Sequence, residues 1–279
     1  MPVARPRRRS MLLLLLAAVL AVIVPFLGWH ETWFGRRLSD KEMDQYLRDT
    51  DRPRRIQHAL SQIAGRIARG DPAASTWYPR VVEVSRHPAQ AIRATAAWVM
   101  GQDNACEPFH KALLRLLEDP ELIVRRNAAL ALVRFKDASG RAELAGMLES
   151  HLVAAPASGR LSMRLEHGQN VGSGTLLAQV TSDGGHAVEV RSPFPGQIDG
   201  VFAGDGSPVR QRDRLVSLKP GPDQVFEALR GLYLIGEADD LVHVEQYMTQ
   251  GRPPSGRIQM QAAYTAQAIR ARSTRTSIH

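Results

Sequence analysis

One apolar pattern occurs five times in this chain, with hydrophobic or small residues at positions i, i+4, i+7 and i+8. This spacing places the four residues on one face of an α-helix. The five occurrences begin at Ile56, Ile92, Val124, Val225 and Ile258. The intervals between them are 36, 32, 101 and 33 residues, so three of the four have the length of one helical pair. Because a single pair cannot bury its own apolar face, we predict an α-solenoid of about five stacked pairs.

Two of these segments carry a further signature. They read AIRATAAW at 91–98 and IVRRNAAL at 123–130. Both resemble the second helix of HEAT repeats. The resemblance implies a mainly α superhelix, and it makes Arg93 and Arg125 structural residues at the start of that helix. Different residues stand at the corresponding positions of the other units: Gln57, Phe226 and Gln259.

The long interval, between the third and the fourth pattern, indicates an insertion. Removing one repeat of about 33 residues leaves 68, which is the length of the stretch 155–222. Both borders of this stretch are rich in small residues, proline and glycine, as is typical of insertion points. We therefore predict helical repeats over 38–150 and 223–272, with a separate domain over 155–222 between the two helices of the fourth pair.

The inserted stretch contains the same half-motif twice, at an offset of 38 residues. Each copy has the form Gly-x-x-Val, followed six residues later by Leu in an alternating strand pattern. The matched residues are Gly168 and Gly206, Val171 and Val209, and Leu177 and Leu215. A glycine turn with a returning strand makes a small β unit, so two copies predict a two-fold-related, all-β sandwich.

This stretch, with its VEVRSP segment at 188–193, resembles the biotinyl/lipoyl-like domain, a barrel-sandwich hybrid of two interlocked half-motifs. In carrier members of that family, a lysine at a hairpin tip before this segment receives the prosthetic group. Gly185 stands at that position, and Lys219 at the far end is the one lysine of the stretch. We therefore expect no cofactor. Unmodified versions of the domain occur in periplasmic adaptor (membrane fusion) proteins, with a long coiled-coil hairpin where this chain has about 15 connecting residues.

The amino-terminal region contains an uncharged run at 11–29, preceded by Arg5, Arg7, Arg8 and Arg9. A helix of this length spans about 28 Å, close to the hydrocarbon thickness of a bilayer. The positive residues favour a cytoplasmic tail at 1–10. We therefore predict a single-pass membrane protein whose body is extracytoplasmic, or periplasmic in a Gram-negative cell; a cleaved signal peptide is the alternative.

The remaining residues give little sign of catalytic chemistry. The net charge is +8, and half of it comes from the four arginines before residue 10. The single Cys106 cannot form an internal disulfide, and the histidines, including His151, His167 and His186, lack the spacing of metal ligands. We find no grouping typical of a catalytic site and predict that the chain is not an enzyme and holds no metal. The polar tail at 273–279 is predicted to be disordered.

The leading functional hypothesis is a membrane-anchored scaffold or adaptor that binds protein partners in the cell envelope, as an accessory part of a transport or secretion assembly. We expect no nucleic acid and no small-molecule ligand among its partners. Two alternatives stay open. One is a carrier or enzyme subunit that uses the lipoyl-like domain, and the other is a basic solenoid that binds nucleic acid.

Overall fold

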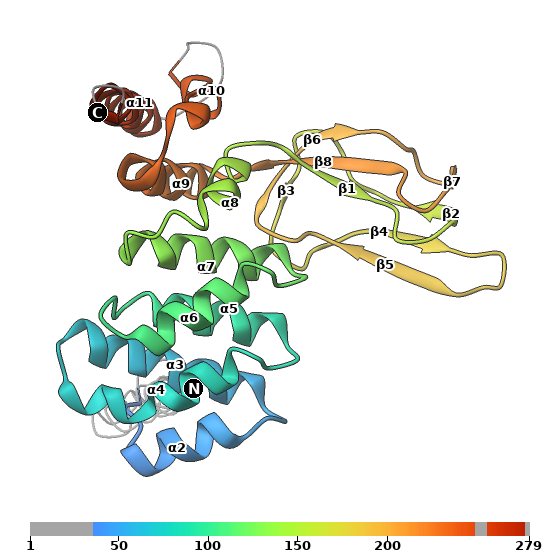
Figure 1. Cartoon of the computed structure of the whole chain (residues 1–279). Helices are drawn as coiled ribbons and strands as arrows, with labels where there is room; N and C mark the ends of the chain where they lie inside the picture. The colour runs from blue at the N-terminus through green and yellow to red at the C-terminus, as the bar shows by residue number, and fades with distance from the viewer. Residues whose placement is uncertain (1–35, 249–255, 277–279) are drawn as a thin grey trace, which may run out of the picture.

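The computed structural model describes residues 36–248 and 256–276, and Figure 1 shows a stack of helical pairs from which a β module projects. The predicted tail at 1–10 and the predicted anchor at 11–29 lie outside the described residues. The described helices form five pairs: α2 (Asp40–Arg48) with α3 (Pro53–Ala68); α4 (Tyr78–Val84), after the 3-10 turn η1 (Pro72–Trp77), with α5 (Gln90–Met100); α6 (Glu107–Leu116) with α7 (Leu122–Arg134); α8 (Arg141–Gly146) with α9 (Pro222–Ile235); and α10 (Leu241–Glu245), after η2 (Ala238–Asp240), with α11 (Gly256–Thr276).

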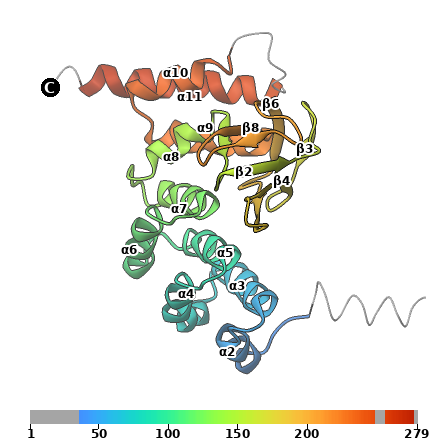
Figure 2. The same cartoon turned by 90° about the vertical axis from the view of Figure 1, so that its right-hand side faces the viewer.

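The predicted second helices are α3, α5, α7, α9 and α11, and each begins within a few residues of its apolar pattern. Nineteen of the twenty pattern residues are buried, which explains why the pairs stack. The exception is Tyr233, which is 43% exposed because its ring lines an open hollow beside α9. Figure 2 shows α3 and α5 on one side of the stack and the first helices α4 and α6 on the other.

The predicted membrane topology is corrected by the structure. Across residues 36–248 and 256–276, no helix is both long and apolar enough to cross a bilayer. This finding contradicts the prediction of a single-pass membrane protein, and we withdraw that prediction together with the extracytoplasmic and periplasmic placement that depended on it.

The last helix is longer than predicted. It continues to Thr276, whereas the sequence pattern placed the end of the repeats at 272. Ser273 and Thr274 belong to this helix, and their hydroxyl groups donate to the carbonyl oxygens of Ile269 and Arg270, one turn earlier, instead of ending it. Polar composition alone therefore misplaced this boundary.

The β module contains eight strands in two four-stranded antiparallel sheets, ordered β1-β8-β6-β3 and β5-β4-β2-β7. The strands are β1 (His151–Ala154), β2 (Gly159–Ser162), β3 (Asn170–Val171), β4 (Leu176–Thr181), β5 (Ala187–Arg191), β6 (Gly196–Val201), β7 (Pro208–Val209) and β8 (Arg214–Pro220). The module lies between α8 and α9. Its first strand begins before the predicted boundary at 155, because β1 pairs with β8 and is drawn into the sheet.

The two halves of the module interlock. β2 pairs with β7 of the other half, and β6 pairs with β3 in the same way. Gly168 and Gly206 both have a positive φ, of 87° and 77°. The backbone N–H group of each donates to a carbonyl oxygen of the other half, that of Ile198 at 2.7 Å for Gly168 and that of Leu161 at 2.8 Å for Gly206. The other four half-motif residues, Val171, Val209, Leu177 and Leu215, are buried in the core of the module.

Replacing Gly206 with alanine should lower the free energy of unfolding by more than about 1 kcal/mol, because a left-handed backbone strains an L-residue. The matched control is Gly204→Ala in the same turn, since Gly204 has no positive φ and its added Cβ would have ordinary contacts. Gly204→Ala should change stability by less than about 0.5 kcal/mol. Urea unfolding of both variants tests this, and equal losses would contradict the left-handed requirement.

Candidate functional site

Arg93 and Arg125 make the same set of contacts in successive pairs. Arg93 donates from Nε and Nη2 to the carboxylate of Asp119, at 2.7 and 2.8 Å, and from Nη1 to the carbonyl oxygens of His87 and Pro88. Arg125 donates from Nε to Glu143 Oε1 at 2.6 Å and from Nη1 to the carbonyl oxygens of Asp119 and Pro120. Each arginine thus ties its own interhelical loop to an acid of the next pair, so its role here is structural.

The partner carboxylate of Arg93 is the better buried of the two acids. The Asp119 side chain is 6% exposed. Burial by itself raises the pKa of Asp119, but hydrogen bonds from Arg93 and the Glu121 amide, with the charges of Arg93 and Arg125, outweigh it and lower that pKa below its usual value. The Asp119 carboxylate is therefore ionised at neutral pH.

A third arginine, Arg126, fixes the β module on the solenoid. Its guanidinium lies 4.2 Å from the ring centroid of Phe194, in the β5–β6 loop, and Nη2 donates to the carbonyl oxygen of Gly146 at 3.2 Å. Burial lowers the pKa of Arg126 to about 10. Leu122 and Ile123 of α7 also pack against the core of the module. The module is therefore seated on the start of α7.

Sequence reasoning missed the role of Arg126. A signal was present, because the repeat needs one arginine at the start of the second helix and this unit has two in succession. The second one, at 126, corresponds to Ala94 in the preceding unit, where no module is attached. An arginine that the repeat does not require, next to an insertion, indicates a contact with the inserted domain.

The predicted carrier position lies at the far tip of the module. Gly185, with a φ of 79°, belongs to the turn between β4 and β5 and is exposed. Lys219 lies instead in β8, in the wall of a pocket beside α9. No lysine of the described chain therefore occupies the tip where a carrier domain displays its amine. Burial lowers the pKa of His151, which packs edge-on against Phe194, whereas His167 and His186 lie in exposed turns.

The structure brings together no group of three or more His, Cys, Asp or Glu side chains that could hold a metal ion, among the residues it describes. Cys106 precedes α6 and is partly buried. Burial raises the pKa of its thiol, which favours the unreactive protonated form.

The exposed side of the second helices is the surface that the repeat leaves open, and we call it the second-helix face. Six residues after the start of each apolar pattern, this face carries Gln62, Trp98, Leu130, Gly231 and Tyr264. Trp98 is 48% exposed and Tyr264 is 59% exposed. Arg134 Nη1 donates to Gln102 Oε1 at 3.1 Å, which links the end of α7 to the turn that follows α5. Exposed aromatic groups thus occupy two of these five equivalent positions.

A hollow of about 1140 Å³ lies at the C-terminal end of this face, between α7, α9 and α11, and we call it the aromatic hollow. Tyr233, Leu234 and Tyr264 line it, together with Arg134 and Arg230. Gly231 also borders it, and its lack of a side chain lets α9 pack closely on α8, since a Cβ there would come within 2.8 Å of the buried Leu144 side chain. The hollow thus combines apolar surface with a few hydrogen-bond donors, as protein-binding sites do.

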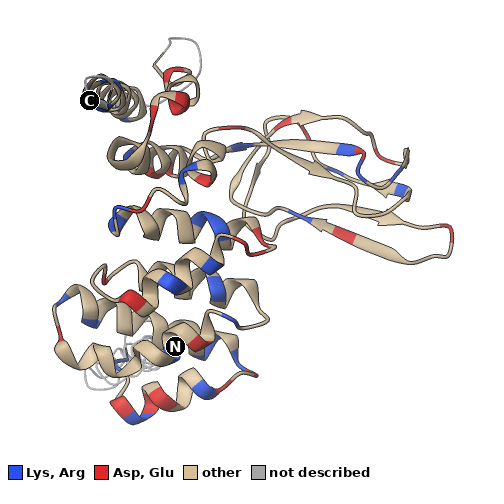
Figure 3. Cartoon of the chain, viewed as in Figure 1, with Lys and Arg blue, Asp and Glu red and all other residues tan. Residues whose placement is uncertain are grey.

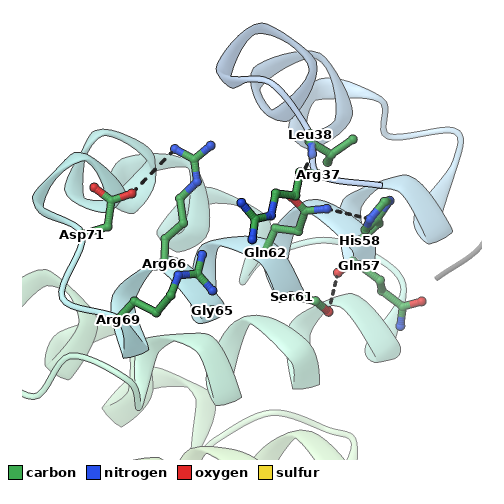
Figure 4. Close-up of a pocket in the computed structure, with 10 residues that line it drawn as sticks. All are labelled: Arg37, Leu38, Gln57, His58, Ser61, Gln62, Gly65, Arg66, Arg69 and Asp71. Carbon is green, nitrogen blue, oxygen red and sulfur yellow. Dashed lines mark hydrogen bonds and ion pairs between the residues drawn. The ribbon is translucent and has the colours of Figure 1, made fainter. Parts of the chain in front are cut away.

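A second hollow, of about 670 Å³, lies at the N-terminal end of the face, and we call it the arginine hollow. Gly65 of α3 forms its floor, and Arg37, Arg66 and Arg69 line its sides (Figure 4). The Gln62 amide fixes one wall: its Oε1 accepts from the Leu38 N–H at 2.9 Å, and its Nε2 donates to the Arg36 carbonyl oxygen at 2.7 Å.

Charged residues elsewhere are interspersed. Figure 3 shows basic and acidic residues alternating along the solenoid and the β module. Many of them are paired, as in the contacts of Arg93 and Arg125 with Asp119 and Glu143. A nucleic-acid-binding surface needs a continuous basic stripe, so this distribution does not favour that alternative.

Residues 78–155 match the family model of HEAT repeats, a range that runs from the start of α4 to just past β1. The chain contains HEAT-like helical repeats. The match includes both segments for which the resemblance was predicted, at 91–98 and 123–130. HEAT repeats commonly mediate protein–protein interactions. No curated protein matches the chain.

Proposed function

We propose that this chain is a protein-binding scaffold whose second-helix face holds a partner. The observation that carries the proposal is the recurrence of exposed Trp98 and Tyr264 at one repeat position, with the aromatic hollow beside Tyr264. Exposed large apolar groups that cluster on one face mark interaction sites, and aromatic residues dominate the binding energy of such sites.

The β module forms the second part of the proposal. The interlocked pairing of β2 with β7 and of β6 with β3 supports a biotinyl/lipoyl-like fold, and glycine at 185 supports a version without a prosthetic group. We assign the module the role of a second contact surface. The contact between Arg126 and Phe194 places it beside the stack, so a partner can touch both parts at once.

Photo-crosslinking tests the proposal. With benzoyl-phenylalanine at Trp98 or Tyr264, we expect one and the same discrete partner to be captured in cells from both positions. The matched control is Val242 of α10, which is 70% exposed but belongs to a first helix. The proposal fails when Val242 captures the same proteins as Tyr264, or when Trp98 and Tyr264 capture unrelated ones.

A further inference from the structure

The arginine hollow contains more positive charge than its own surroundings neutralise. Arg66 is satisfied: its Nη2 lies 2.8 Å from Asp40 Oδ1, its Nη1 lies 4.0 Å from Asp71 Oδ2, and its guanidinium lies 4.7 Å from the ring centroid of Trp77. The two acids beside the hollow are thus both matched to Arg66. No acid beside the hollow is thus left to pair with the other two arginines, Arg37 and Arg69.

Arg37 and Arg69 have no such partner. Within residues 36–248 and 256–276, neither guanidinium makes an ion pair or a hydrogen bond with the protein, and both residues are exposed. Figure 4 shows their guanidinium groups directed into the hollow, over the floor formed by Gly65. Two guanidinium groups therefore face the arginine hollow from different elements. Arg37 lies before α2, and Arg69 lies at the end of α3.

We propose that the arginine hollow binds a carboxylate side chain from an acidic segment of the protein partner. A guanidinium binds a carboxylate through two parallel hydrogen bonds, and two of them can hold one carboxylate or two neighbouring ones. The rest of the wall combines the side chains of Gln57, Ser61 and Gln62 on α3 with apolar surface that includes Leu38, a mixture that fits a peptide. This inference rests on the proposed function and adds the charge of the partner to it.

The lining of the hollow favours a carboxylate over a nucleic acid. Its ten lining residues include no Phe, Tyr or Trp on which a base could stack, and the one imidazole, that of His58, is held by the Gln62 amide at 2.8 Å. The middle and the C-terminal end of α3 form its floor. A second helix, α2, begins beside the hollow, but its N-terminus is closed by the capping box of Ser39 and Glu42, which reduces its capacity to bind a phosphate.

The arginine hollow and the aromatic hollow also lie in register. Gln62 and Gly65 line the first, and their repeat equivalents Gly231 and Leu234 line the second. Trp98 and Leu130 hold the same repeat position as Gln62 in the units between them. One extended segment along the second-helix face would therefore meet apolar surface at one end and the two arginines at the other.

Fluorescence anisotropy with the full chain and a labelled oligoglutamate peptide tests the inference at low salt. We expect saturable binding that weakens by about tenfold or more in the Arg37→Gln/Arg69→Gln double variant. The matched control is Arg164→Gln/Arg210→Gln, which removes the same charge from exposed arginines of the β module and should change binding by less than about twofold. An oligoglutamine peptide of equal length should not bind.

A second variant separates the hollow from the general charge of the protein. A Cβ at Gly65 would lie 3.3 Å from Nη1 of Arg69, so Gly65→Leu fills the floor and leaves the charge unchanged. Weaker oligoglutamate binding in Gly65→Leu supports the inference. The inference is overturned if the two double variants lose oligoglutamate binding equally. It is also overturned if a single-stranded oligonucleotide displaces the labelled peptide at a lower concentration than unlabelled oligoglutamate does. Photo-crosslinking from Tyr264 tests the proposed scaffold function separately, because that measurement does not depend on the arginine hollow.

Discussion

Replacing Phe194 with alanine is expected to lower the free energy of unfolding of the chain by about 4 kcal/mol, as truncating a fully buried aromatic ring does. Phe194 is 0% exposed and belongs to the core of the β module. Its loss also removes the ring from beneath the Arg126 guanidinium and from the edge of His151. The buried cation then faces a cavity, and the seat of the module on α7 loosens.

Chemical denaturation measures the loss in stability, and Phe202→Ala is the matched control. Phe202 follows β6 in the same module but is 53% exposed, so its removal should cost less than about 1 kcal/mol. Proteolysis under native conditions gives a second measurement, because a loosened module should be cut faster at 151–220 than in the unchanged protein. Equal stabilities of the two variants would show that Phe194 does not hold the junction.

Replacing Asp119 with alanine should cost about 3 kcal/mol of stability at neutral pH, since it leaves the poorly exposed Arg93 guanidinium without its counter-charge. The carboxylate accepts two hydrogen bonds from Arg93 and one from the Glu121 backbone N–H. Glu118→Ala is the control, because Glu118 is the neighbouring acid and is exposed. It should change stability by less than about 0.5 kcal/mol.

The pH dependence gives an independent check on Asp119. Its folded-state pKa is lowered, so the stability it contributes is fully present above the unfolded value of about 3.9 and is lost as the pH falls through the folded value. The stability difference between the unchanged protein and Asp119→Ala should therefore be constant above about pH 5 and shrink below about pH 4. A difference that stays constant to pH 2 would show that the carboxylate is not the source.

The helical part of the fold was predictable from the sequence because its signal is local and repeated. Four of the second helices contribute four buried positions at fixed spacing and α9 contributes three, and glycines such as Gly168 and Gly206 mark turns that need a positive φ. β1 escaped prediction because a strand with a single buried side chain, Val153, has no alternation to detect, and its place depends on pairing with β8. Strand pairing between two distant segments cannot be predicted from the sequence of either segment alone.

The candidate site was less predictable, because exposure on a repeat protein depends on how the pairs curve past one another. Trp98 lies within the HEAT-like segment at 91–98, yet nothing in that segment says that its ring is open to solvent. Arg37 and Arg69 lie on different elements, and their common hollow exists only once Gly65 is placed beneath them. By contrast, the correspondence between Gln62 and Gly65 of the first pair and Gly231 and Leu234 of the fourth pair follows directly from the repeat intervals.

The way in which the β module joins the solenoid has a mechanical consequence. The chain enters the module at His151 and leaves it after Pro220, and His151 is paired with Leu218, so both connections lie at one end of the β1–β8 ladder. Tension that separates α8 from α9 would load this end first and open the antiparallel pair rung by rung. Unravelling of residues 151–220 would release about 230 Å of extended chain. A stretched solenoid would therefore lengthen at its fourth pair while the other pairs stay stacked.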